Sequence, residues 1–125
     1  MVQPLRVLIA DNSIRTRDGL RALFATCSEI ELVGEAANGY EAVRLVSECH
    51  PDAVLMDLQM PVMDGLQATR HIKDKWPEVT VVVLTLYASQ HAAARTAGAD
   101  AFVIKGGDPG QLLAALCGGS AVANR

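Results

Sequence analysis

Residues 53–57 of the chain read AVLMD, four apolar residues followed by an aspartate. Such a short, unbroken apolar run fits a strand that is buried on both faces of a parallel sheet. Three similar runs also end in one polar residue: VLIAD at 7–11, VVVLT at 81–85 and AFVIK at 101–105. Residues 30–37 alternate apolar and polar side chains in part, which predicts a less buried edge strand.

The segments between these runs carry apolar residues at helical spacing. Helices are predicted over residues 13–27, 39–49, 64–76, 88–97 and 109–117. Asp64 and Gln67 have the spacing of a capping box, and Gly98 is suited to end the fourth helix. Strand and helix therefore alternate five times, which predicts an α/β fold with a single, doubly wound (βα)5 parallel sheet.

Composition limits the possible function classes. The chain has 125 residues, half of them apolar, and a formal net charge of -3, so we expect one domain without a nucleic-acid-binding surface. The three cysteines lack metal-site spacing and are interpreted as small buried residues.

No signal peptide or membrane-length apolar run is evident, so a soluble, cytoplasmic protein without membrane contact is expected. Residues 1–118 form the predicted domain, and residues 119–125 read as a tail or the start of a linker.

One polar residue follows each of the four buried runs: Asp11, Asp57, Thr85 and Lys105. Ligands of open parallel sheets bind beyond the carboxyl ends of the strands, and one of the few allowed topologies brings these four ends together. Two close carboxylates suit Mg²⁺, and a carboxylate can attack phosphorus. A hydroxyl and an ammonium can stabilise the charge of a transferred phosphoryl group.

These residues also resemble a known family. The segments VLIADN at 7–12 and DLQMPVMDG at 57–65, together with Thr85 and Lys105, are similar to the signature of response-regulator receiver domains. The likeness runs from about residue 5 to residue 116. It implies a flavodoxin-like fold with strand order 2-1-3-4-5.

Two further segments, GLRAL at 19–23 and VGEAANG at 33–39, resemble the NarL/FixJ (LuxR-type) branch of that family. Receivers of that branch are usually joined to a C-terminal helix-turn-helix domain. The resemblance therefore implies that any DNA contact would be made by such a domain outside residues 1–125.

The resemblance assigns a role to each site residue. Asp57 would be the phosphoacceptor. Mg²⁺ would be held by Asp11, Asn12, Asp57 and the backbone carbonyl of Gln59. The family usually has two acids after the first strand, so Asn12 is expected to weaken Mg²⁺ binding.

A second set of roles concerns the switch. Thr85 and Lys105 would contact the phosphoryl oxygens, and Thr85 and Phe102 would be the switch residues. Phe102 has no hydroxyl with which to hydrogen-bond when turned inward. The span from Thr85 to Lys105 is about two residues shorter than usual in the family, so the fourth helix is expected to be short or displaced.

The resemblance thus implies a phosphorylation-dependent switch that receives its phosphoryl group from a sensor histidine kinase and controls transcription. A homodimer is a further expected partner state. It would be no enzyme beyond its own phosphorylation and dephosphorylation. Asn12 and the short fourth-helix region favour an alternative, a phosphorylation-independent dimerisation or interaction module. Another alternative is a phosphatase of the haloacid-dehalogenase type, which would need an acid where Gln59 stands.

Overall fold

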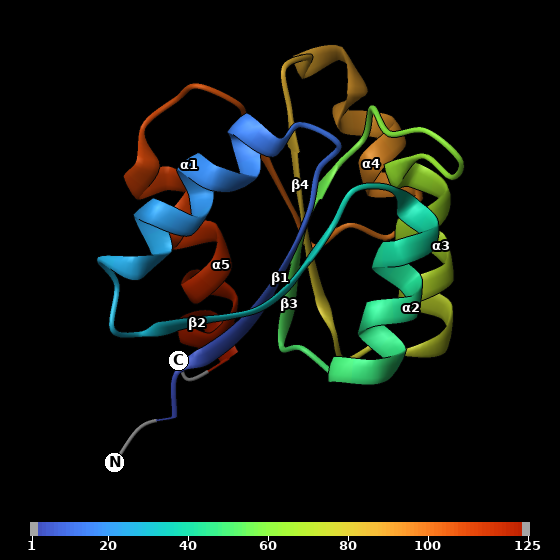
Figure 1. The fold of residues 1–125 in the computed structure, drawn as a ribbon. Helices are drawn as coiled ribbons and strands as arrows, with labels where there is room; N and C mark the ends of the chain where they lie inside the picture. The colour runs from blue at the N-terminus through green and yellow to red at the C-terminus, as the bar shows by residue number, and fades with distance from the viewer. Residues whose placement is uncertain (1–2, 124–125) are drawn as a thin grey trace.

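The computed structural model of the chain describes residues 3–123, and it describes side chains as far as residue 117. Five strands alternate with five helices (Figure 1). The strands are β1 (Leu5–Ala10), β2 (Ile30–Ala36), β3 (Ala53–Asp57), β4 (Thr80–Thr85) and β5 (Ala101–Ile104). The helices are α1 (Ile14–Ala25), α2 (Gly39–Cys49), α3 (Gly65–Lys75), α4 (His91–Thr96) and α5 (Pro109–Ala123), with a 3₁₀ turn, η1 (Ala88–Gln90), before α4.

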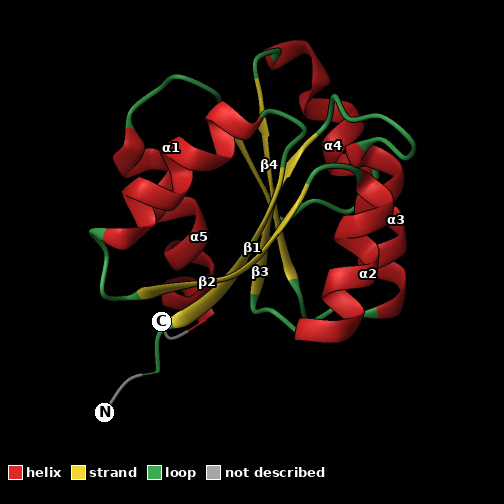
Figure 2. Cartoon of the chain, viewed as in Figure 1, coloured by secondary structure: helices red, strands yellow, loops and turns green. Residues whose placement is uncertain are grey.

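The strands form one parallel sheet in the order β2-β1-β3-β4-β5. Helices α1 and α5 cover one face of this sheet, and α2, α3 and α4 cover the other (Figure 2). The predicted doubly wound (βα)5 sheet and its 2-1-3-4-5 order are both confirmed. This order places the carboxyl ends of β1, β3, β4 and β5 next to one another at one edge.

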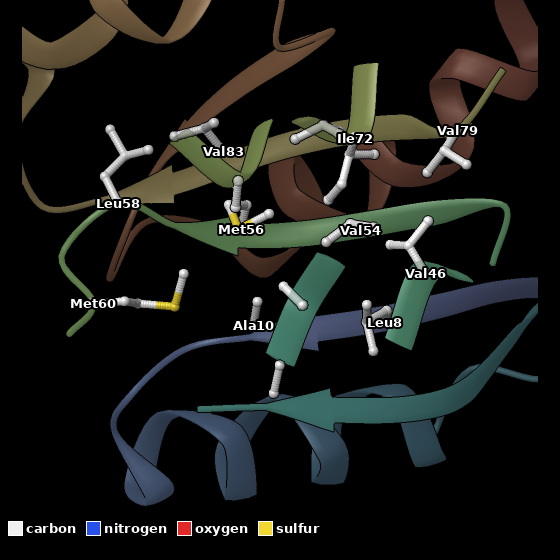
Figure 3. Packing of buried hydrophobic residues seen from close by; sticks show 14 of the residues in the cluster. Leu8, Ala10, Val46, Val54, Met56, Leu58, Met60, Ile72, Val79 and Val83 are labelled. Carbon is white, nitrogen blue, oxygen red and sulfur yellow. The ribbon is translucent and has the colours of Figure 1, made fainter. Parts of the chain in front are cut away.

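The core consists of two apolar layers, one on each face of the sheet. On the α2–α3 face, Met56 and Val54 of β3 pack with Ile72 of α3 and Val46 of α2 (Figure 3). All five residues of β3 are buried, as its unbroken apolar run predicts for a strand inside a parallel sheet. Strand β2 lies at the edge of the sheet and is only partly buried, as its alternating pattern predicts.

Local signals fix most helix ends where the sequence predicts them. The capping box of Asp64 and Gln67 is confirmed at the start of α3. Gly98 follows α4 with a φ of 103°, a conformation that glycine adopts without strain. Helix α4 has only six residues, which confirms that the fourth helix is short.

Two expectations need adjustment. The three cysteines are free and only partly buried, so the expectation that they are small buried residues is too strong. Helix α5 continues to Ala123, past its predicted end at residue 117. The assignment of residues 119–125 to a tail or linker stays a prediction, and its last two residues lie outside the described part of the chain. Within residues 3–123, no helix has both the length and the apolar character needed to cross a membrane.

Candidate functional site

The carboxyl edge of the sheet brings together the polar residues that follow the buried strands. Asp57 and Thr85 are the last residues of β3 and β4, and Asp11 and Lys105 directly follow β1 and β5. Their side chains are withdrawn from solvent: Asp11 is 2% exposed, Asp57 is 4% exposed and Thr85 is fully buried. Lys105 is partly buried. The strand order explains this meeting, since neighbouring parallel strands end at the same edge.

Lys105 links the two carboxylates. Its Nζ lies 2.9 Å from Oδ2 of Asp11 and 3.4 Å from Oδ2 of Asp57. Burial, and then the negative charge of Asp11, raise the pKa of Asp57 above its ordinary value, and they outweigh the opposing effect of Lys105. Burial by itself would lower the pKa of Lys105, but its contacts with the two carboxylates prevail and raise that pKa. These three side chains, which we call the acidic half of the site, therefore form one electrostatically coupled group.

Asp11 is held in place from its backbone as well as its side chain. Its Oδ1 accepts a hydrogen bond of 2.8 Å from the backbone N–H of Ser13. Its backbone carbonyl accepts a 2.6 Å hydrogen bond from Nη1 of Arg17, whose Nε also lies 3.3 Å from Glu35 on β2. Sequence reasoning missed Arg17 and Glu35, because their pairing depends on how α1 packs against β2.

The loop after Asp57 is closely packed against the site. The backbone N–H of Gly65 donates to the carbonyl of Leu58 at 3.1 Å, and a Cβ on Gly65 would lie 2.0 Å from the backbone oxygen of Asp57. Farther along the loop, Gly39 of α2 donates to the carbonyl of Met63 at 2.8 Å. The two residues of the Asp64–Gly65 pair in the sequence signature thus have separate structural roles. Asp64 caps α3, and Gly65 allows the close approach of two backbone segments.

The same loop contains a tight turn at Val62. This residue has a φ of 70°, which is unusual for a β-branched side chain, and it is 84% exposed. The backbone N–H of Met63 donates to the carbonyl of Pro61 at 2.8 Å, so Val62 is the central residue of a three-residue γ-turn.

Thr85 and Phe102 form what we call the switch half of the site. Each of the two side chains is in contact with a residue of the segment that follows β4. The hydroxyl of Thr85 donates to Oε1 of Gln90 at 2.9 Å and accepts from the backbone N–H of Tyr87 at 3.3 Å. The ring of Phe102 packs on that of His91, with ring centroids 4.8 Å apart and planes tilted by 56°. Within the described residues, the Thr85 side chain makes no hydrogen bond with Asp57 or Lys105. No pattern in the sequence indicates that Gln90 would contact Thr85 or that His91 would contact Phe102.

A divalent cation fits the acidic half. Oδ2 of Asp11 is buried, and its one close partner among the described residues is the Lys105 ammonium at 2.9 Å, which leaves room on this oxygen for a further ligand. Two carboxylates completed by waters and phosphate oxygens are the donor set that Mg²⁺ accepts. Residues 3–123 contain no group of three or more His, Cys, Asp or Glu side chains placed to hold a metal. Asn12 and Gln59 are exposed, and their part in metal binding stays a prediction.

The comparison with known families agrees with this geometry. The family model described as "Response regulator receiver domain" matches residues 7–117. The chain belongs to this family. Receiver domains are signalling modules rather than conventional enzymes, and the similar proteins place this one in the NarL/LuxR branch.

The receiver is similar to proteins known by sequence and by structure. The uncharacterized transcriptional regulatory protein YhcZ of Bacillus subtilis (strain 168) is 45% identical over 111 residues, which are 87% of this chain and 52% of YhcZ. A two-component response regulator of the LuxR family from Aurantimonas sp. SI85-9A1 superposes with a TM-score of 0.87 and 32% identity, over 98% of this chain and 88% of that one. The receiver thus spans about half the length of the curated relatives it matches.

A second similar structure contains BeF3 and magnesium. It is the CheX–CheY–BeF3–Mg+2 complex from Borrelia burgdorferi, with a TM-score of 0.84 and 26% identity over 92% of this chain and 88% of that one. The family typically uses Mg²⁺, which agrees with the donor set formed by Asp11 and Asp57.

Proposed function

We propose that this receiver domain is a phosphorylation switch in which Asp57 accepts a phosphoryl group from a sensor histidine kinase. One observation carries the proposal: Asp57 is buried at the carboxyl edge of the sheet, beside a second carboxylate and 3.4 Å from a lysine ammonium. A structural ion pair would need one acid and one base. Here two buried acids share one base, so a second cation is needed to balance the charge of the group.

The proposed reaction is a phosphoryl transfer. A carboxylate oxygen of Asp57 attacks phosphorus, and the new P–O bond forms as the P–N bond to the kinase histidine breaks. The imidazole leaves with the electron pair of that bond. Mg²⁺, held by Asp11 and Asp57 with Asn12 and the Gln59 carbonyl, would supply charge neutralisation for the phosphoryl oxygens. Lys105 contributes a second positive charge at the same place.

The added group changes the charge of the site. A phosphoryl group brings about 1.5 to 2 negative charges, toward which Lys105 and the hydroxyl of Thr85 move. Phe102 then repacks, and coupling of about 1–3 kcal/mol shifts the population of the switched state. The output is control of transcription in the cytoplasm, through a changed homodimer contact or a helix-turn-helix domain outside residues 1–125. The domain catalyses only its own phosphorylation and dephosphorylation.

Two observations favour a second candidate function. Helix α4 has six residues, and Asn12 is exposed where the family usually has an acid. Such a domain would act as a phosphorylation-independent dimerisation or interaction module. It would then show no Mg²⁺-dependent response to a phosphoryl donor.

The decisive experiment is phosphorylation with acetyl phosphate at millimolar Mg²⁺, with intact mass spectrometry as the readout. We expect one acid-labile phosphoryl group on the wild type and none on Asp57→Asn. The matched control is Asp74→Asn, the same change at an exposed position on α3, and it should be phosphorylated like the wild type. Equal uptake by Asp57→Asn would contradict the proposed acceptor, and no uptake by the wild type would favour the interaction module.

A further inference from the structure

The hydroxyl of Thr85 is already engaged. Its proton is donated to Oε1 of Gln90 at 2.9 Å, and its oxygen accepts the Tyr87 N–H at 3.3 Å. Thr85 is fully buried, so bulk water does not compete for this hydroxyl. A hydroxyl has a single proton to donate. It therefore cannot serve Gln90 and a phosphoryl oxygen at once.

Gln90 is well placed to hold Thr85. It is the last residue of η1, and its backbone N–H donates to the carbonyl of Tyr87 at 3.1 Å. The next residue, His91, begins α4 and packs its ring on Phe102. Of these two consecutive residues, Gln90 thus contacts Thr85 and His91 contacts Phe102.

We propose that Gln90 is a positioning residue that holds Thr85 in its unphosphorylated arrangement and so opposes binding of the phosphoryl group. This inference rests on the proposed function of Asp57. Contact between Thr85 and a phosphoryl oxygen first requires the Gln90 hydrogen bond to break. Its release also frees η1 and the start of α4, and this links the state of Asp57 to the packing of His91 on Phe102.

The test replaces Gln90 with leucine, which has a similar shape and no acceptor. The readout is the dissociation constant of beryllofluoride at saturating Mg²⁺, followed by ¹⁹F NMR of the mimic itself. The net worth of one hydrogen bond predicts binding about fivefold tighter in Gln90→Leu than in the wild type. Unchanged or weaker binding would overturn the proposal. Most damaging substitutions weaken binding, so tighter binding is a result that mere structural damage does not give.

Two further variants make the result specific. Gln111→Leu makes the same chemical change at an exposed position of α5 and should bind like the wild type. In a Thr85→Val background, which lacks the hydroxyl, Gln90→Leu should have no effect on the dissociation constant. An effect that persists there would mean that Gln90 acts by another route, against the proposal. If Gln90→Leu is not folded by ¹⁵N NMR, Gln90→Ala takes its place with the same expected direction.

The same titrations separate this proposal from the proposed function. Mg²⁺-dependent binding by the wild type that disappears in Asp57→Asn supports the switch, whatever Gln90 does. If neither the wild type nor Gln90→Leu binds the mimic, both proposals fail. If Gln90→Leu binds the mimic and the wild type does not, the Gln90 hydrogen bond is sufficient to prevent binding, and the Gln90 proposal is supported.

Discussion

The acidic half and the switch half of the site lie at the same edge of the sheet, but they are held in different ways. Lys105 contacts both carboxylates of the acidic half, and close backbone approaches fix the loop that follows Asp57. The switch half is held by Gln90 and His91, which belong to one short segment, η1 and the start of α4.

This difference has a functional consequence. The contacts of the acidic half are compatible with an added phosphoryl group, because Lys105 remains available to new negative charge. The contacts of the switch half compete with it, since the Thr85 hydroxyl must leave Gln90 before it can donate elsewhere. Under the proposed function, the acidic half would accept the phosphoryl group as it stands, and the switch half would rearrange afterwards.

The largest effect is expected from breaking the packing of the acidic half at Gly65. In Gly65→Ala the new Cβ would meet the backbone oxygen of Asp57 at 2.0 Å, and neither backbone can yield without moving β3 or α3. We expect the free energy of unfolding to fall by about 2–4 kcal/mol, measured by urea denaturation.

The matched control is Gly19→Ala in α1, where a Cβ would meet nothing within 4 Å. This variant should gain about 0.5–1 kcal/mol, because alanine favours the helix. If Gly65→Ala were as stable as Gly19→Ala, the loop would be less tightly packed than described.

A medium effect is expected from the charge of Asp57. Because its pKa is raised in the folded protein, the ionised carboxylate destabilises the fold at neutral pH. Asp57→Asn should therefore raise the free energy of unfolding by about 1 kcal/mol at pH 7. The gain should shrink as the pH falls through the raised pKa of the folded protein, and it should vanish below the ordinary pKa, where Asp57 is protonated in both the folded and the unfolded state.

This prediction is checked by thermal unfolding of the wild type and Asp57→Asn between pH 3.5 and 8, a range chosen to span the ordinary aspartate pKa of about 3.9. Asp74→Asn, with its exposed side chain, serves as the control. A gain that grew on acidification would have the wrong sign, and would mean that Lys105 stabilises the ionised form of Asp57 more than burial and Asp11 destabilise it.

The smallest effect is expected in the switch half. His91→Ala removes one ring from the contact with Phe102 and should cost about 0.5 kcal/mol, the lower range for an aromatic pair. Phe102 ring signals in the ¹H NMR spectrum should shift in this variant. They should stay in place in His71→Ala, which removes an exposed imidazole from α3. Unshifted Phe102 signals in His91→Ala would show that the rings do not pack together in solution.

Much of this site follows from sequence alone. Each buried run ends in a polar residue, and the sheet order brings Asp11, Asp57, Thr85 and Lys105 to one edge. The capping box at Asp64 is likewise a local signal that the structure confirms. These features are predictable because they depend on periodicity, capping and topology, which are written along the chain.

The contacts around those residues are not predictable in the same way. Gln90 reaches Thr85 because η1 turns the chain just after β4. Arg17 reaches the Asp11 carbonyl because the start of α1 turns its side chain back toward the end of β1. Both contacts depend on side-chain directions across a turn or between elements. No pattern of residue types specifies such directions.

The γ-turn loop after Asp57 has a mechanical consequence. The backbone N–H of Gly65 ties the start of this loop at Leu58, and that of Gly39 ties the loop near its end at Met63, so hydrogen bonds hold both ends of the loop beside Asp57. On the other side of Asp57, the short segment of η1 and the six-residue α4 follows β4. Under the proposed function, a rearrangement that starts at Asp57 would meet the tied loop on one side and this short segment on the other. We therefore expect η1 and α4, rather than the loop, to take up the movement.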